Sequence, residues 1–117
     1  KKDNITVDKT FQFSLSIIAF YQQLLSDKEY VLSKQLLRSG TSIGANVEES
    51  LAAQSRSDFI HKMSLASKEA RETRYWLKLL NRSSLTNIPI DELLEDVGEI
   101  INILTKIVIS SKNSTNI

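Results

Sequence analysis

Residues Gln35–Trp76 read QLLRSGTSIGANVEESLAAQSRSDFIHKMSLASKEARETRYW, and this stretch decides the fold. In its first half, small and polar side chains recur at steps of three and four, which places them on one face of an α-helix: Gln35, Ser39, Ser42, Asn46 and Glu49. An apolar row runs beside them and has the spacing of a core-facing stripe: Leu32, Leu36, Ile43 and Val47. The pattern predicts a helix with a polar stripe next to its buried face.

Two glycines, Gly40 and Gly44, stand inside this predicted helix. Together they cost a helix about 2 kcal/mol relative to alanine. Glycines four residues apart share a face and allow another backbone to approach closely, which offsets that cost. We therefore expect one continuous helix; the alternative is a break at Ser39-Gly40.

Composition sets the broad class. A chain of 117 residues with 41% hydrophobic and 25% charged residues is an ordinary globular domain, so we treat residues 1–117 as one domain. One proline and three glycines favour long regular elements. The absence of cysteine excludes disulfides and thiolate metal sites. No apolar run has the length of a membrane span and no signal-like segment begins the sequence, so we expect a cytoplasmic protein without a membrane partner.

Helical periodicity extends along the whole chain. It predicts helices over about 9–25, 29–54, 58–81 and 89–110, with residues 1–8 and those after Ser110 as loose polar ends. The first helix has apolar residues at helical steps: Phe13, Ile17, Ile18, Phe20, Tyr21, Leu24 and Leu25. Ser26 or Asp27 is the expected cap of the second helix, and Ser55 or Ser57 that of the third.

The third predicted helix carries a heptad-like seam: Phe59, Met63, Ala66, Ala70, Thr73, Leu77 and Leu80. Pro89 is expected in the first turn of the fourth helix, whose apolar row is Ile90, Leu93, Leu94, Val97, Ile100, Ile101, Leu104, Ile107 and Val108. Short connections force neighbouring helices to run antiparallel. The predicted fold is all-α, an antiparallel up-down-up-down four-helix bundle.

Apolar residues remain beyond these stripes: Leu65, Trp76, Leu79, Ile103 and Ile109. Burying a large apolar side chain is worth about 1.5–3 kcal/mol. This surplus favours contact between subunits, while the alternative is a scatter of exposed hydrophobic residues, which monomers tolerate.

No residue pattern indicates catalysis, a metal or a cofactor, and we expect a non-enzymatic protein. His61 is the only histidine and cannot found a metal site alone. The paired carboxylates Glu48–Glu49 and Glu69–Glu72 are expected to be structural, the latter pair with Lys68 and Arg71 as partners. The alternative is that Glu49 and Glu72 pair across helices with Gln35, Asn46 or an arginine. The segment Gly40–Gly44 lacks the lysine and the strand of a P-loop. A helix-turn-helix with its turn at Gly40 would present Glu48 and Glu49 towards DNA phosphates, which opposes binding.

Charge is unevenly distributed although the net charge is only +1. Residues 56–82 carry seven basic and three acidic side chains, whereas residues 89–112 carry two basic and five acidic ones. A basic stripe follows the third predicted helix at steps of three and four: Lys68, Arg71, Arg74, Lys78 and Arg82. It is a candidate nucleic-acid surface; the alternative is an ordinary solvated face whose charge nearby glutamates balance.

Several motifs together resemble a known family. The segments QLLRSGTSIGANVEES, DFI, LASKEARET and WLKLL are similar to the bacterial four-helix proteins named for the intervening sequences of 23S rRNA genes. The resemblance covers Phe13–Leu104, and its motif residues are Gln35, Arg38, Ser42, Ile43, Asn46, Glu49 and Glu72. The chain departs from the family pattern at Ser50, where glycine is frequent, and at Lys68-Glu69, where Gly-Ser is common.

The resemblance implies an up-down bundle that assembles as a homo-oligomeric ring, with a pentamer favoured, and that has no enzymatic activity. Relatives include the accessory variability proteins of diversity-generating retroelements, which bind a reverse transcriptase and nucleic acid. The sequence therefore suggests two functions. One is an adaptor for RNA or for a nucleic-acid enzyme, and the other is a self-associating scaffold that recognises a protein partner.

Overall fold

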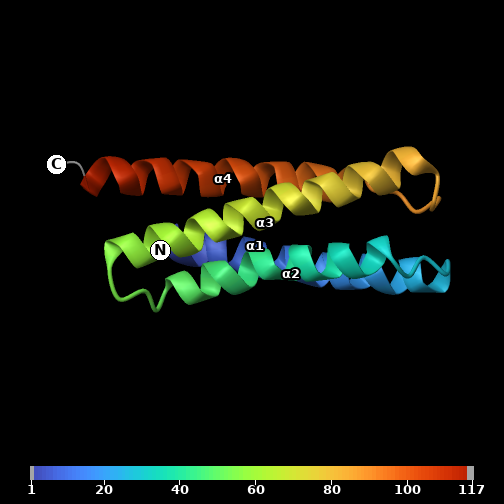
Figure 1. The fold of residues 1–117 in the computed structure, drawn as a ribbon, viewed down its shortest axis with the longest axis horizontal. Helices are drawn as coiled ribbons and strands as arrows, with labels where there is room; N and C mark the ends of the chain where they lie inside the picture. Colours follow the sequence, from blue (N-terminus) through green and yellow to red (C-terminus); the bar gives the residue numbers. More distant parts are fainter. Residues whose placement is uncertain (1, 116–117) are drawn as a thin grey trace.

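The computed structural model describes residues 2–115, which form four helices in an elongated bundle of 51 × 23 × 22 Å. The helices are α1 (Lys2–Ser26), α2 (Leu32–Ser50), α3 (Arg56–Ser83) and α4 (Asp91–Thr115). Consecutive helices run antiparallel, so the chain goes up and down the bundle twice (Figure 1). Within the described range there is no strand, and no helix is long and apolar enough to cross a membrane. The predicted all-α four-helix bundle is confirmed.

One apolar core runs the length of the bundle. The predicted seam of α3 is buried except for Phe59, which is half-buried at the core edge. From α2 the core takes Leu36, Ile43 and Val47, which have no exposed surface. α1 and α4 complete it with Phe13, Ile17, Phe20, Leu24, Leu93, Val97, Ile100, Ile101 and Leu104, and Ile90, the residue before α4, joins them. The helical spacing of apolar residues therefore identified the buried faces, except that Ile18, predicted in the apolar row of the first helix with Ile17, is exposed.

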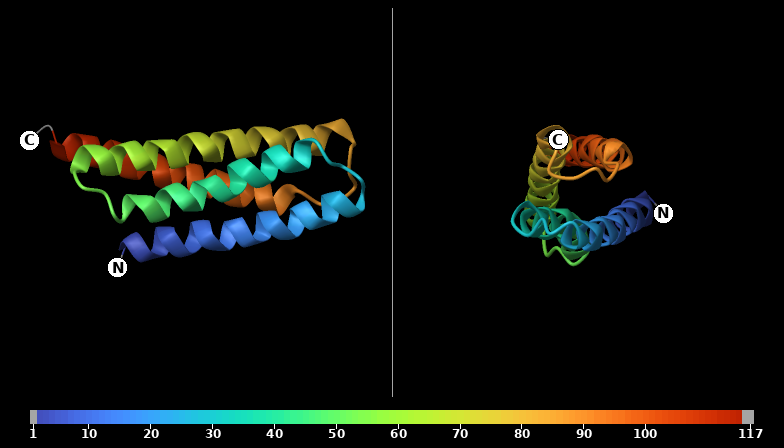
Figure 2. Two further views of the ribbon diagram at one scale, coloured as in Figure 1. Left: turned by 60° about the horizontal axis from the view of Figure 1, so that its bottom comes forward. Right: turned by 90° about the vertical axis from the view of Figure 1, so that its right-hand side faces the viewer.

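The four helices do not contact their neighbours equally. α3 packs along both α2 and α4, and α1 packs along α2, whereas α1 and α4 touch least. Viewed from the end, the bundle is correspondingly more open between α1 and α4 (Figure 2). One ion pair crosses this seam, with Lys9 Nζ 2.8 Å from Glu99 Oε1. α1 is thus held chiefly by α2.

The contact between α1 and α2 is made at the two interior glycines of α2. A Cβ added at Gly40 would lie 2.9 Å from both γ-carbons of Ile17, and one added at Gly44 would lie 3.3 Å from the carbonyl oxygen of Thr10. α2 passes through both glycines without interruption. The prediction of a continuous helix with a close backbone approach is confirmed. The helix-turn-helix alternative is wrong, because no turn exists at Gly40, and the same continuity excludes a phosphate-binding loop over residues 40–44.

Both ends of the chain are more helical than the sequence predicted. α1 starts at Lys2, where a loose segment over residues 1–8 was expected; Lys1 lies outside the described residues. Thr6 and Thr10 are buried, and the Thr10 hydroxyl donates to the carbonyl oxygen of Thr6, 2.9 Å away. Because these hydroxyls can bond within their own helix, polar residues here do not end the pattern. α4 likewise continues beyond Ser110 to Thr115.

α2 is shorter than predicted, because its ends are set by side chains and turns that periodicity does not detect. The carboxylate of Glu29 accepts hydrogen bonds from the backbone N–H groups of Leu32 and Ser33, so neither Ser26 nor Asp27 is the cap. Ser55 does cap α3 as predicted, accepting from the N–H of Asp58 at 3.0 Å. Pro89 lies two residues before α4, outside the first turn in which it was expected.

We predict that Gly40→Ala destabilises the fold whereas Gly98→Ala stabilises it. Ile17 is fully buried and β-branched, so it cannot move away from a new methyl group, and overpacking of this kind costs about 1–3 kcal/mol. Gly98, in α4, has nothing within 4 Å of its Cβ position, so alanine there gains about 0.5–1 kcal/mol of helix propensity. Urea unfolding of the two variants checks both signs. Equal stability of the two variants would contradict the close approach of α1 to α2.

Candidate nucleic-acid interface

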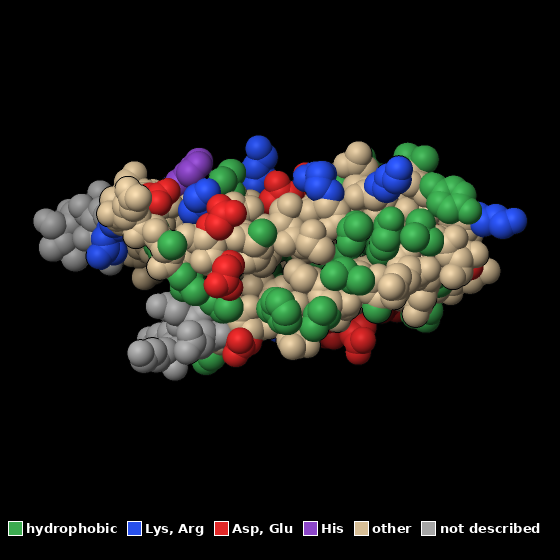
Figure 3. Space-filling view, turned by 90° about the horizontal axis from the view of Figure 1, so that it is seen from below, with side chains coloured by type: hydrophobic (Ala, Val, Ile, Leu, Met, Phe, Trp, Pro, Cys, Tyr) green, Lys and Arg blue, Asp and Glu red, His purple; other side chains and the backbone are tan. Residues whose placement is uncertain are grey.

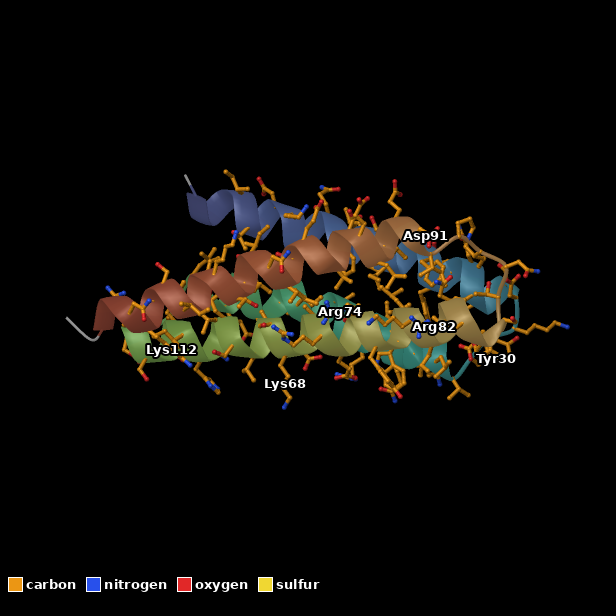
Figure 4. All side chains as sticks on the ribbon, turned by 90° about the horizontal axis from the view of Figure 1, so that it is seen from above. Tyr30, Lys68, Arg74, Arg82, Asp91 and Lys112 are labelled. Atoms are coloured by element: carbon orange, nitrogen blue, oxygen red, sulfur yellow. The ribbon has the colours of Figure 1, made fainter. Side chains whose placement is uncertain are left out.

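The five predicted basic residues lie on the outer surface of α3. Lys68, Arg71, Lys78 and Arg82 are exposed, while Arg74 is half-buried. Arg74 and Arg82 lie on the side of α3 that faces α4, and Lys68 lies on the side away from it (Figure 4). The residues therefore form a band across the outer surface of α3 rather than a straight row. From Lys68 to Arg82 this band is about 21 Å long at 1.5 Å per residue.

No member of this basic stripe forms an ion pair with any described residue. Arg71 donates from Nη2 to the hydroxyl of Thr105 on α4 at 3.3 Å, which orients its guanidinium without neutralising it. The other four side chains have neither a hydrogen bond nor an ion pair within the described range. None of the five cations on this surface is therefore paired with a carboxylate of the described residues.

The glutamates of α3 are bound on its opposite flank. Arg38 of α2 donates from Nη1 to Glu69 Oε1 at 3.3 Å and from Nη2 to Glu72 Oε2. The indole N–H of Trp76 donates to the same Glu72 oxygen at 2.9 Å. The expectation that Glu69 and Glu72 pair with Lys68 and Arg71 is therefore wrong, because the rotation of α3 turns these carboxylates towards α2. The alternative that Glu72 pairs with an arginine of another helix is confirmed. The glutamates do not balance the stripe.

The other family-motif residues follow the boundary between α2 and α3. Ile43 is fully buried in the core, while Gln35 is exposed and Ser42 and Asn46 are half-buried. The Ser42 hydroxyl and the Asn46 amide donate to carbonyl oxygens one turn earlier in α2. Glu49, at the far end, accepts from Lys62 Nζ of α3 at 2.8 Å. This hydrogen bond and the negative charge of Glu49 raise the pKa of Lys62 above its ordinary value.

A buried polar contact between α2 and α3 escaped the sequence analysis. The Thr73 hydroxyl lies 2.9 Å from the Ser39 hydroxyl, and both side chains are fully buried. Thr73 was placed in the apolar seam and Ser39 in the polar stripe, and their meeting depends on the relative register of two helices. The sequence indicates this contact only through spacing: Ser39 lies three residues after Leu36 and four before Ile43, and Thr73 belongs to the seam of α3.

The residues considered for catalysis are dispersed. His61 is exposed on α3, and no group of three His, Cys, Asp or Glu side chains within residues 2–115 could hold a metal ion. Glu69 and Glu72 share one guanidinium, which gives the two carboxylates the same partner rather than the different surroundings that separate an acid from a base. Glu48 and Glu49 are both exposed and point along different directions of α2. These side chains are therefore arranged as separate surface residues rather than as one cluster.

We predict that Arg38 and Glu72 are energetically coupled. Arg38→Ala leaves two glutamates adjacent without their shared cation, and Glu72→Gln removes one of the carboxylates. Because Arg38 is half exposed, the coupling should be modest, about 0.5–1 kcal/mol in a double-mutant cycle. Urea unfolding of the two single variants and of the double variant measures it. The emission of Trp76, the single tryptophan, should shift in Glu72→Gln; additive effects with unchanged emission would contradict the network.

Comparison with known proteins places this geometry in a family. A family model described as 23S rRNA-intervening sequence protein matches residues 2–106. A crystal structure from Bacteroides thetaiotaomicron, of a protein of the S23 ribosomal protein family described as having unknown function, is 47% identical. It superposes with a TM-score of 0.87 and covers 92% of this chain and 98% of that one. No curated protein matches the chain. The chain therefore belongs to the family of 23S rRNA-intervening sequence proteins.

Proposed function

We propose that this protein is a non-enzymatic, self-associating adaptor that binds RNA through the basic stripe of α3. The observation that carries the proposal is the set of five cations without an ion-pair partner in the described chain. A row of uncompensated cations is what a phosphate backbone binds, because each neutralised phosphate releases a counterion. Membership in a family named for 23S rRNA makes RNA the nucleic acid to examine first.

The surroundings of the stripe define its strongest part. Asp91 and Glu92 stand in the first turn of α4, at the same end of the bundle as Arg82 (Figure 4). These carboxylates lower the positive potential at that end. The centre of the RNA surface should therefore be Arg71, Arg74 and Lys78, where the facing residues of α4 include the neutral Thr105.

Self-association strengthens this surface. One stripe of five cations binds weakly at physiological ionic strength, whereas repeated copies on one assembly bind the same strand with higher avidity. We propose a homo-oligomer, with the pentameric ring of the sequence-based expectation as the favoured form. A nucleic-acid enzyme that carries RNA would bind the basic stripe of α3 through that RNA.

A second function is favoured by a different observation. Phe11, Leu15 and Ile18 on α1 are 60%, 46% and 39% exposed, which is more apolar surface than a single isolated residue accounts for. A self-associating scaffold that recognises a protein partner would use such a surface. The two functions differ in their dependence on salt, because apolar contacts are insensitive to counterions.

Binding of fluorescein-labelled single-stranded RNA, followed by anisotropy at several salt concentrations, tests the RNA proposal. We expect affinity to fall as salt rises. The variant Arg71→Gln/Arg74→Gln/Lys78→Gln should reduce the slope of log K against log[salt] by about 2. A control that replaces Lys28, in the connection between α1 and α2, and Lys106 of α4 with glutamine should change the slope by less.

Two outcomes would overturn the RNA proposal. One is an absence of binding at low salt, and the other is an equal loss in the stripe variant and in the control. Co-purification of a protein partner without nucleic acid at ordinary ionic strength would instead support the scaffold.

A further inference from the structure

One exposed aromatic side chain lies within the basic stripe of α3. Tyr75 is 56% exposed, although it lies well inside a 28-residue helix. Between residues 62 and 80 the exposed residues of α3 are Lys68, Arg71, Tyr75 and Lys78. Tyr75 is therefore the one uncharged side chain among the exposed residues of this part of the helix.

Helical spacing places Tyr75 on the same face as the cations. Together with Arg82, these residues follow one another at steps of three, four, three and four. Arg71 stands about 6 Å before Tyr75 along the helix axis, and Lys78 stands about 4.5 Å after it. A cation therefore lies about one helical turn from the ring on each side, where it can bind a phosphate of a strand that passes over the ring.

The neighbouring indole restrains the ring of Tyr75. The centroids of the Tyr75 and Trp76 rings lie 5.3 Å apart with their planes at 67°, so the edge of one ring meets the face of the other. Trp76 is itself fixed, because it packs against the core and its N–H donates to Glu72 Oε2 at 2.9 Å. The Tyr75 hydroxyl makes no hydrogen bond with a described residue. An apolar contact thus positions the ring while more than half of the residue stays exposed.

The other two exposed aromatic residues of the described chain, Phe11 and Tyr30, have different surroundings. Phe11 belongs to the outer face of the α1–α2 pair, where hydrophobic side chains gather and Lys and Arg side chains lie mainly along the edges (Figure 3). Tyr30 lies in the connection between α1 and α2, outside the helices. Tyr75 is thus the exposed aromatic residue that shares a helix face with a row of cations.

We propose that the basic stripe binds single-stranded RNA and that one base of the strand stacks on the ring of Tyr75. Single-stranded RNA carries both groups that this face can bind, namely phosphates for the cations and unpaired bases for the ring. In an RNA duplex the bases are paired inside the helix, so the phosphates reach the stripe but no base reaches Tyr75. The inference rests on the RNA function proposed above and adds the form of RNA that the surface selects.

The variant Tyr75→Ala separates stacking from charge. It should lower the affinity for fluorescein-labelled single-stranded RNA by about fivefold or more, which is the usual contribution of one stacked base. The slope of log K against log[salt] should keep its wild-type value, because no phosphate-binding charge is removed. The affinities for a labelled RNA duplex and for a strand of the same length without bases should not change. Tyr75→Phe keeps the aromatic face and should bind single-stranded RNA like the wild type.

Tyr30→Ala is the matched control, because it removes a tyrosine of similar exposure, 54%, outside the stripe. It should leave every affinity unchanged, and circular dichroism checks that each variant is folded. Three results overturn the stacking site while leaving the RNA function intact: wild-type affinity of Tyr75→Ala for single-stranded RNA, an equal loss for all three RNAs, or the same loss in Tyr30→Ala. An absence of RNA binding by the wild-type protein at low salt overturns both proposals.

Discussion

The close approach of α1 to α2 at Gly40 and Gly44 is the constraint on which the rest of the structure depends. With no side chain at Gly40, the buried Ile17 lies directly against the backbone of α2. This contact fixes the rotation of α1 about its own axis. Ile17 faces the core, and the neighbouring Phe11, Leu15 and Ile18 consequently face outward. The exposed apolar face of the molecule thus follows from the positions of two missing side chains.

A second constraint separates the charges of α3. Arg38 reaches across from α2 and holds Glu69 and Glu72, while Trp76 donates to Glu72 from within α3. Glu69 and Glu72 are therefore paired on the side of α3 that faces α2. The basic stripe from Lys68 to Arg82 remains on the outer surface of α3. A chain with a net charge of only +1 acquires a concentrated positive surface in this way.

The fold could be predicted because the apolar steps of α3, from Met63 to Leu80, have one structural interpretation. The helix ends could be predicted less well, since they depend on individual hydrogen bonds. Glu29, three residues before Leu32, caps α2 with its carboxylate, although glutamate is not a usual capping residue. The Thr10 hydroxyl donates to a carbonyl oxygen within α1, so this polar residue lies inside the helix instead of ending it.

The residues of the candidate site were found in the sequence, but their partners were not. Steps of three and four locate the basic residues on one helix. They do not reveal that Arg38, more than thirty residues away, binds Glu69 and Glu72 and so turns these carboxylates away from the basic stripe. Nor do they distinguish Ile17 from Ile18, because adjacent residues compete for the core until the partner helix is placed. Pairing between helices depends on their relative rotation, which a single sequence does not specify.

An even number of antiparallel helices brings the start of α1 and the end of α4 to the same end of the bundle (Figure 1). Two copies joined in tandem within one polypeptide could stand side by side in the same direction with a connector of only a few residues. An antiparallel arrangement of the two copies would need a connector that spans the 51-Å length of the bundle, about 15 extended residues. The length of the connector in such a fusion would therefore decide whether the two copies lie parallel or antiparallel.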